Sequence, residues 1–514
     1  MIELELSASV LCFVIPLLFF FIINLSSIFS TLRSPNSSKI PKSYPIIGHL
    51  LALRANQDRR VQWLSEAVRS TPTATFVLHR PLGHSHVITG NPANVQHILK
   101  TNFHIYVKGR IARESLSEIL RDGIFNTNGP SWKFQRQTAS YEFNTKSLRK
   151  FVQTAVDTEL SNRLIPILSD AVKNGTVLDL QDILQRFAFD NICKIAFGYD
   201  PGYLLPSLAD TKLVVSFETA VQISSDRLNN SFHPLIWKMK KFLDIGSEKQ
   251  LRIAVDEVRS FAKQIIREKK QQEFDGKKSS LESENDLLSR LLGSGHSNED
   301  FVTDIIISFM LAGRDTTSAA LVWFFWLVSK HPEVENEILK EIQETSESPV
   351  YEQVKEMAYT HASLSETMRL YPPVPIDSKE AMADDVLPDG TAVKRGMRVG
   401  YLPYAMGRLE KLWGADWAEF RPERFLQRHP AEGPRKWSYV AKDPYTYTVF
   451  QAGPRICLGK EMAYLQMKRL AASVLRRFRV VPVEEGVEPV FIFYLTSQMK
   501  GGFPVRIEAR REKT

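Results

Sequence analysis

A single cysteine in a glycine-flanked turn constrains this chain more than any other feature of its sequence. Cys457 lies in the run FQAGPRICLG, from Phe450 to Gly459, directly before an apolar helix predicted to start near Lys460. Such a turn exposes the sulfur to several backbone N–H groups and to the helix N-terminus, and both stabilise a thiolate. A thiolate so placed can bind haem iron and donate the electron density that favours O–O cleavage. The run therefore predicts an activated thiolate that could serve as a ligand of haem iron, and any fold proposed for the chain must hold Cys457 in such a turn.

The remaining cysteines and the charge balance exclude several other classes of protein. With only Cys12 and Cys193 besides Cys457, the chain holds neither a disulfide framework nor a zinc site built from four cysteines. Both are predicted to be small apolar residues, one in an N-terminal apolar run and one in a helix. The 66 Lys and Arg residues against 58 Asp and Glu give a net charge of +8, spread along the chain. This balance fits a basic face for an acidic partner or a membrane surface, and we expect no nucleic-acid partner.

An uncharged N-terminal segment predicts a membrane anchor. Residues 6–32 contain no charged side chain, and as a helix they would be about 40 Å long, enough to span a bilayer with tilt. Two glutamates precede the segment and Arg33, Lys39 and Lys42 follow it, so the positive-inside rule places the rest of the chain in the cytosol. The acidic residues also disfavour a cleaved signal peptide, which has a basic n-region. The expected parts are a membrane anchor over residues 1–32, a basic and proline-rich hinge over residues 33–50, and one catalytic domain over residues 51–514.

The spacing of apolar residues predicts a mainly α-helical domain with a smaller β region. Most of residues 92–330 has helical spacing, whereas residues 73–79 and 84–89 are typical of paired strands, and short strands are predicted again near 386–400 and 479–507. The longest helix is predicted from Ser297, as its N-cap, to about Lys330. Between Asp304 and Val328 this helix is apolar on nearly every side, so we expect it to run through the centre of the domain.

Polar residues interrupt the central helix in the segment AGRDTT, from Ala312 to Thr317. Burying acid and hydroxyl groups in an apolar helix costs free energy unless they have a function or a hydrogen-bond partner. A threonine can donate a hydrogen bond to the carbonyl one turn earlier and open the helix locally. Gly313 removes the side chain where a flat cofactor and O2 would need room. The alternative interpretation is a helix kink held by local hydrogen bonds.

Two smaller groups of residues complete the pattern. Glu366 and Arg369, at i,i+3 on one predicted helix, share a face, and Arg424 in the later FRPERF run can bring a second guanidinium to the same carboxylate. Trp132 and Arg136, at i,i+4, lie on one face of a predicted helix and can contact the same group.

In their order along the chain, these patterns resemble those of the cytochrome P450 enzymes. The cysteine run matches the haem-binding signature F-x-x-G-x-R-x-C-x-G, the AGRDTT segment resembles the oxygen-activation motif, and the E-x-x-R, P-E-R-F and W-x-x-x-R elements are similar to theirs. The resemblance extends from the hinge to the C-terminus and is closest to the plant fatty-acid omega-hydroxylases. Gln451 departs from the small residue common at its position in the superfamily but is usual in that group. The segments that resemble the group are LPYAMGR (Leu402 to Arg408), WGADWAEFRPERF (Trp413 to Phe425) and FQAGPRICLGKEMA (Phe450 to Ala463).

The resemblance implies the cytochrome P450 fold and haem b as cofactor, with Cys457 as the axial thiolate ligand of the iron. It implies that Thr316 stabilises the iron-bound dioxygen species and that Asp315 helps to relay protons. The trio Glu366, Arg369 and Arg424 would lock the haem-side core. The other haem contacts implied are Phe450, Trp132, Arg136, Arg455 and Lys379, the last four at the propionates.

The implied reaction inserts one atom of O2 into a C–H bond and reduces the other atom to water. The chain shows no flavin or nicotinamide motif, so electrons from NADPH would arrive through a separate NADPH-cytochrome P450 reductase in the same membrane. The implied location is the endoplasmic reticulum membrane, with a single span and the catalytic domain facing the cytosol. Basic residues that could dock the reductase on the thiolate side are Lys133, Lys460, Lys468 and Arg469.

The expected substrate is a fatty acid, hydroxylated at or near its terminal carbon, and omega-oxidation of a jasmonoyl-amino acid conjugate is the alternative. A haem-thiolate hydroperoxide isomerase or dehydratase would not need the proton relay, and a non-catalytic haem sensor would not need the oxygen motif. Because terminal attack has to be imposed by geometry, we expect a narrow apolar channel. Its carboxylate anchor would be Lys108, Arg110 or Arg113, which could equally be surface charges. The candidate channel walls are Phe309, Ala312, Gly313, Val374, Ile376, Leu495 and Thr496.

Overall fold

A computed structural model of the chain describes residues 41–143, 152–208, 212–229, 234–275, 286–293, 298–346, 350–428, 437–484 and 486–510. The predicted membrane anchor over residues 1–32 lies outside these ranges, as do residues 33–40 of the predicted hinge.

The described chain is mainly helical with a smaller β region, which confirms the predicted fold class. Its α-helices are α2 (Leu50–Ala55), α3 (Arg60–Arg69), α4 (Pro92–Gln96), α5 (Arg110–Ser115), α6 (Ser117–Leu120), α7 (Gly129–Ser140), α9 (Asp157–Glu159), α10 (Ile165–Asn174), α11 (Leu180–Phe197), α12 (Lys212–Asn229), α13 (Leu235–Phe242), α14 (Gly246–Phe274), α15 (Leu287–Gly293), α16 (Glu299–Lys330), α17 (Pro332–Gln343), α18 (Tyr351–Glu356), α19 (Ala358–Leu370), α20 (Pro403–Met406), α21 (Glu410–Trp413) and α22 (Lys460–Arg477). Its strands are β1 (Thr75–His79), β2 (Ser85–Thr89), β3 (Tyr106–Val107), β4 (Leu178–Asp179), β5 (Asp377–Ala381), β6 (Asp385–Val386), β7 (Ala392–Val393), β8 (Arg398–Tyr401), β9 (Leu426–Arg428), β10 (Trp437–Tyr439), β11 (Phe478–Pro482), β12 (Phe491–Phe493), β13 (Ser497–Met499) and β14 (Pro504–Ala509).

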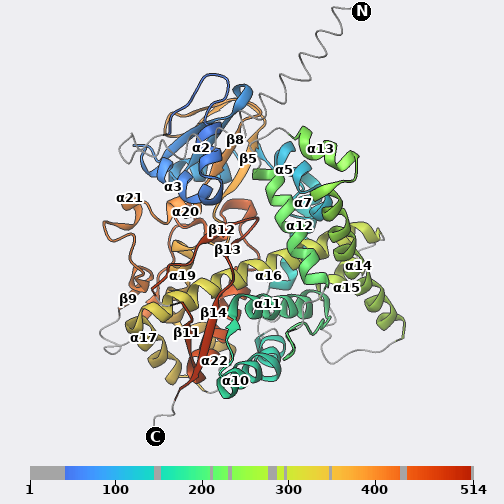
Figure 1. The fold of residues 1–514 in the computed structure, drawn as a ribbon, viewed down its shortest axis with the longest axis vertical. Coiled ribbons are helices and arrows are strands. Elements are labelled where there is room, and N and C mark those ends of the chain that lie inside the picture. Colours follow the sequence, from blue (N-terminus) through green and yellow to red (C-terminus); the bar gives the residue numbers. More distant parts are fainter. Residues whose placement is uncertain are drawn as a thin grey trace, which may run out of the picture.

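The long apolar helix α16 runs through the centre of the helical part, where it packs against α11, α14 and α19 (Figure 1). Its N-cap is Asn298, whose side chain accepts hydrogen bonds from the N–H groups of Asp300 and Phe301. Ser297, the predicted cap, lies outside the described residues. Among the described helices, α16 alone has the length and apolar composition of a membrane span, but 83% of its most apolar stretch is buried. It is therefore the core helix of the domain.

The largest sheet has five strands in the order β1-β2-β8-β5-β3 and lies at the N-terminal side of the molecule (Figure 1). The predicted pairing of residues 73–79 with 84–89 is present as the antiparallel pair β1–β2, in which Thr75 faces Thr89. Strand β8 joins β2 in parallel, and β5 joins β8 antiparallel. This order places β5, which follows α19, between β8 and the early strand β3. The ends of β5 and β8 thereby reach the cavity described below.

A buried ion-pair network ties α19 to the segment after it. Glu366 and Arg369 are fully buried, and the carboxylate accepts hydrogen bonds from Arg369 Nε at 2.6 Å and Nη2 at 2.7 Å. Arg424 Nε donates to the same carboxylate at 3.2 Å, as its spacing predicts. Arg369 also donates to the backbone carbonyls of Trp417 and Glu419, at 2.8 and 3.0 Å. The structure thus brings together the three side chains that the sequence places in one cluster.

Candidate active site

A cavity of about 450 Å³ lies between α16, the cysteine-bearing loop and the chain that enters β5. Its wall combines the middle of α16, including Phe309 and Thr316, with apolar side chains from distant segments such as Val374 and Leu495. Most candidate site residues meet here. Those that line the cavity are Lys108, Trp132, Arg136, Phe309, Ala312, Gly313, Thr316, Val374, Ile376, Lys379, Phe450, Arg455, Cys457, Leu495 and Thr496. Asp315, Arg110 and Arg113 are not part of the lining.

Cys457 is held in a tight loop immediately before α22. Its N–H donates to the carbonyl of Phe450 at 2.8 Å, which closes the loop. Gly453 has a φ of +66°, and a side chain there would collide with the carbonyl of Leu99, so the turn requires glycine. The sulfur is accessible from the cavity. Burial raises the pKa of the Cys457 thiol, while the N–H of Gly459 and the charges of Arg136 and Lys460 act in the opposite direction. Coordination to a metal ion deprotonates such a thiol outright.

Positive charge is in excess at one side of the cavity. Five cationic side chains line it against a single carboxylate, Asp377; the five are Lys108, Arg136, Lys379, Arg398 and Arg455. Burial lowers the pKa of Lys379 to about 7 and that of Arg455 to about 10. The guanidinium of Arg455 lies over the Trp132 ring at 4.4 Å, and Arg136 donates to the carbonyl of Ile456. Buried cations without matching carboxylates need anions from elsewhere. A group with two carboxylates, apolar edges and an iron facing Cys457 fits this lining, and haem has that chemistry.

Asp377, at the start of β5, is a site residue that sequence reasoning missed. Its carboxylate accepts hydrogen bonds from Lys379 Nζ at 2.5 Å, Gln451 Nε2 at 2.6 Å and Lys108 Nζ at 3.2 Å. Although burial acts to raise it, the charges of Lys108 and Lys379 hold the pKa of Asp377 well below its ordinary value. The spacing Asp377-x-Lys379, which puts both side chains on one face of a strand, was the available signal.

Gln451 has a structural role in the hydrogen-bond network around Asp377. This residue has a φ of 63° and a ψ of −179°, a conformation that glycine normally occupies. Its side chain reaches Asp377 and so connects the cysteine loop to β5. A small residue at this position could not make that connection.

The polar segment of α16 places its two candidate catalytic residues differently. Thr316 lines the cavity, and its hydroxyl donates to the carbonyl of Ala312 at 2.6 Å while the helix continues without a break. Asp315 is buried beside Arg314, whose Nη1 lies 3.1 Å from its carboxylate. Arg314 in turn pairs at 2.8 Å with Glu218 of α12, which is 47% exposed. Burial raises the pKa of Asp315 to about 6, so this carboxyl exchanges protons near neutral pH.

Gly313 is required for a helix–helix contact that the sequence did not predict. A Cβ atom at this position would lie 2.5 Å from Cγ1 of Ile192 on α11. The missing side chain therefore makes room for the packing of α11 on α16. Gly313 still forms part of the cavity wall.

Of the three candidate carboxylate anchors, Lys108 alone faces the cavity. Arg110 is 78% exposed and pairs with Glu114 at 3.6 Å. Arg113 donates from Nε to the carbonyl of Asn126 at 2.9 Å and lies 4.0 Å from Asp122. The structure thus separates Lys108 from the two arginines.

The predicted reductase-docking surface is wrong at two of its four positions. Lys468 and Arg469 are 2% and 3% exposed, because they lie on the inner side of α22. Lys468 donates to the carbonyl of Lys355 at 2.9 Å, and Arg469 pairs with Asp157 at 2.6 Å. Lys133 is exposed and Lys460 is partly exposed.

The chain is similar in sequence to known proteins over most of its length. A family model described as "Cytochrome P450" matches residues 39–500. Cytochrome P450 94A1 of Vicia sativa is 60% identical over 476 residues, covering 92% of this chain and 91% of that protein. Cytochrome P450 94A2 of the same plant is 60% identical over 482 residues, covering 93% of each chain. Cytochrome P450 94B3 of Arabidopsis thaliana is 46% identical over 506 residues, covering 98% of each chain.

Proposed function

The chain belongs to the cytochrome P450 family of haem-thiolate monooxygenases, and from this premise we propose that it hydroxylates fatty acids at or near the terminal carbon. The observation that carries the proposal is the wall of the cavity. Apolar side chains surround the region between Cys457 and Thr316, and two lysines, Lys108 and Lys379, line the same cavity. Lys379 is assigned to the propionates, which leaves Lys108, now paired with Asp377 at 3.2 Å, for a substrate carboxylate. Such a lining suits a long hydrocarbon with one carboxylate. The close resemblance of the LPYAMGR and FQAGPRICLGKEMA segments to plant omega-hydroxylases supports the same substrate class.

In this proposal residues from several segments would hold the cofactor. Bound haem would supply a thiolate-ligated iron that activates O2 with two electrons from a reductase. Cys457 would hold the iron, and Arg136, Arg455 and Lys379 would hold the propionates. Phe450, which lines the cavity, would contact the cofactor, and the indole of Trp132 supports Arg455. The walls at Phe309, Val374 and Leu495 exclude water and orient the chain end, which overcomes the greater strength of terminal C–H bonds.

Proton delivery would use Thr316 and Asp315 in sequence. The Thr316 hydroxyl lies at the cavity wall and can hold a proton donor there. Asp315, whose pKa burial raises to about 6, is held by Arg314, which also pairs with Glu218 of α12. Because an arginine stays protonated, Arg314 would orient the carboxyl, and Asp315 itself would exchange protons with water near Thr316.

A substrate panel tests the proposed function. The purified protein, with reductase and NADPH, is offered saturated and unsaturated fatty acids, their methyl esters, a jasmonoyl–isoleucine conjugate and a fatty-acid hydroperoxide. We expect terminal hydroxylation of the free acids that depends on reductase. Turnover of the conjugate alone would favour the alternative substrate. Conversion of the hydroperoxide without reductase would indicate an isomerase or dehydratase, and O2 consumption at background with every compound would indicate a sensor.

Replacing Thr316 with alanine should separate electron use from product formation. The Thr316→Ala protein should fold and bind haem, but the product formed per NADPH should fall by about tenfold or more because the proton donor is lost. NADPH oxidation, product and hydrogen peroxide are measured together. The matched control is Thr303→Ala on the same helix, since Thr303 makes the same bond to the carbonyl one turn earlier, at 2.7 Å, away from the cavity. Unchanged coupling in Thr316→Ala would refute the role.

Replacing Lys108 with alanine should weaken binding of the free acid by about tenfold, because a desolvated charged hydrogen bond is lost. Binding of the methyl ester should change much less, since the ester carries no charge. Both dissociation constants are measured by titration of the haem absorption spectrum. The exposed Arg110→Ala and Arg113→Ala variants serve as controls. Equal effects on acid and ester at all three positions would end the anchor hypothesis.

We also propose that α13 contacts the membrane, with the catalytic domain facing the cytosol. Seven of its eight residues are exposed, four of them apolar and three of them lysines; the next residue, Leu243, is also exposed, and Phe242 is 89% exposed. A fluorophore on Met239→Cys in the full-length, reconstituted protein should be quenched by brominated lipid. The same fluorophore on Lys340→Cys of α17, at the other end of the molecule (Figure 1), should not be quenched. Equal quenching at both positions would contradict this orientation.

For reductase docking, Lys133 and Lys460 remain the candidates.

A further inference from the structure

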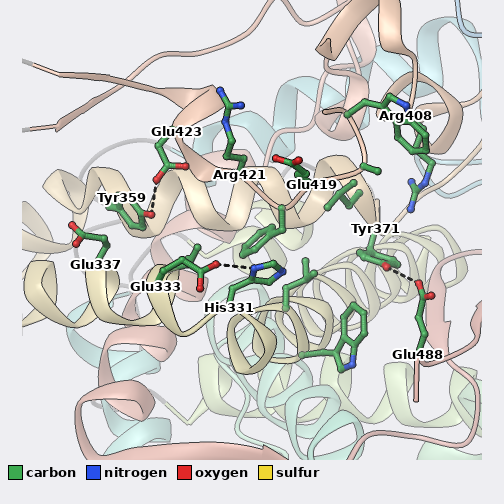
Figure 2. A pocket seen from close by; sticks show the side chains of 17 residues that line it. His331, Glu333, Glu337, Tyr359, Tyr371, Arg408, Glu419, Arg421, Glu423 and Glu488 are labelled. Atoms are coloured by element: carbon green, nitrogen blue, oxygen red, sulfur yellow. Dashed lines mark hydrogen bonds and ion pairs between the residues drawn. The ribbon is translucent and has the colours of Figure 1, made fainter. Parts of the chain in front are cut away.

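A second cavity, of about 820 Å³, opens between the C-terminal end of α16, α17, α19 and the segment from Trp417 to Glu423 (Figure 2). Within the described residues, no side chain lines both this cavity and the haem cavity. Its size is in the range of cavities that bind small molecules. The function proposed above makes no use of it.

The charges in this second cavity are strongly polarised. Five glutamates line it, in a chain whose net charge is +8. Figure 2 shows Glu333, Glu337 and Glu423 near Tyr359 at one end, and Arg408 beside Tyr371 at the other end. Glu488 also lies toward the Arg408 end, where it accepts a hydrogen bond from the Tyr371 hydroxyl at 3.3 Å. Three glutamates therefore lie at one end, and the other end presents a guanidinium together with Glu488.

Arg408 forms no ion pair within the part of the chain that the structure describes, although Glu488 lies toward the same end of the cavity. Its Nη1 donates a hydrogen bond to the carbonyl of Tyr404 at 3.3 Å. Its Cζ atom lies over the rings of Tyr404 and Tyr371, at 3.6 and 5.5 Å from their centroids. Burial lowers the pKa of Arg408, and the nearby charges of Arg369 and Arg69 act in the same direction. A desolvated, unpaired cation facing a cavity calls for an anion. Arg421, in the same cavity, is already paired with Asp416.

Aromatic side chains form the wall between the two ends. The ring of Tyr371 stacks on that of the buried Trp323, with 4.0 Å between ring centroids and an interplanar angle of 1°. It also packs edge-on against Trp326, with 5.8 Å between ring centroids. Phe420 packs against His331 at 5.2 Å. This wall suits an apolar spacer.

We propose that this cavity is a second ligand site, which takes a small zwitterion with an apolar spacer. Its carboxylate binds Arg408, and its ammonium group lies among the glutamates of the opposite end. A simple anion would be repelled by five carboxylates, and a simple cation would leave Arg408 unpaired. A ligand with both charges, such as an ω-amino acid, satisfies both ends.

The test uses the haem-loaded, full-length protein and isothermal titration calorimetry with 6-aminohexanoate. Hexanoate and hexylamine, which each carry one of the two charges, are titrated as comparisons. We expect 6-aminohexanoate to bind at least about tenfold more tightly than either, because each end contributes a charge-assisted hydrogen bond. The haem absorption spectrum is recorded in parallel and should not change, since binding of the amine at the iron would shift it.

The variants locate the site. Arg408→Gln should weaken 6-aminohexanoate binding by about tenfold or more, and Glu337→Gln should weaken it severalfold. Arg421→Gln, the matched control in the same cavity, should bind like the unaltered protein. If Arg408→Gln does not fold, Arg408→Lys, which keeps the charge but not the planar fork, should give an intermediate affinity. Equal binding of the three compounds, unchanged binding in the Arg408 variants, or binding accompanied by a haem spectral shift would each overturn the proposal.

Discussion

Replacing Cys457 with histidine should abolish the red-shifted absorption band expected of the reduced, CO-bound protein, and product formation should fall to background. The thiolate donates electron density to the iron, whereas a neutral imidazole donates less and is the proximal ligand of globins and peroxidases. The loop itself should persist, because its closure depends on the backbone bond from residue 457 to the carbonyl of Phe450 and on Gly453. The CO difference spectrum and product analysis are the measurements.

Cys193 provides the control for this experiment. It is fully buried in α11 and does not line the cavity. Cys193→Ala should therefore keep the band and the activity, with at most a modest loss of stability from the atom removed. Retention of the band in Cys457→His, or its loss in Cys193→Ala, would contradict the assignment of Cys457 as the axial ligand.

The sequence predicted best those parts of the site in which chemistry and local geometry coincide. The cysteine loop needs glycines, an arginine and a helix start within ten residues, so it could be found by its spacing alone. The central helix was equally predictable, because a helix that is apolar on nearly every side is expected to be buried in the core. The β1–β2 pair followed from local alternation and a turn.

Contacts between distant segments escaped prediction. Asp377 matters because Lys108 and Gln451, which lie 269 and 74 residues away in the chain, reach the same carboxylate. No local sequence pattern indicates that these three side chains are in contact. Gly313 was correctly placed on the cavity wall, but the atom that excludes a side chain belongs to Ile192 on another helix. Lys468 and Arg469 look like surface charges in the sequence, yet tertiary packing buries both.

Removing the carboxylate of Glu366 should have the largest effect on stability. Glu366→Ala leaves Arg369 and Arg424 in the core without their shared counter-charge, and breaking a buried ion pair in this way costs about 3–5 kcal/mol. Since native proteins are stable by only about 5–15 kcal/mol in total, we expect little folded, haem-loaded protein at the growth temperature. The yield of haem-loaded protein and its urea unfolding midpoint are the measurements.

Arg424→Ala is the graded comparison, because it removes one arginine but leaves Glu366 paired with Arg369. Its contact with Glu366 is longer, at 3.2 Å against 2.6 Å, and it has a second carboxylate partner in Asp416, at 2.9 Å. We expect a smaller loss, of about 1–3 kcal/mol. In both variants the turnover per folded, haem-loaded molecule should stay near that of the unaltered protein, since none of the three side chains lines the cavity. Normal stability with lost turnover in Glu366→Ala would instead give the carboxylate a part in the reaction, and that outcome would refute the structural role.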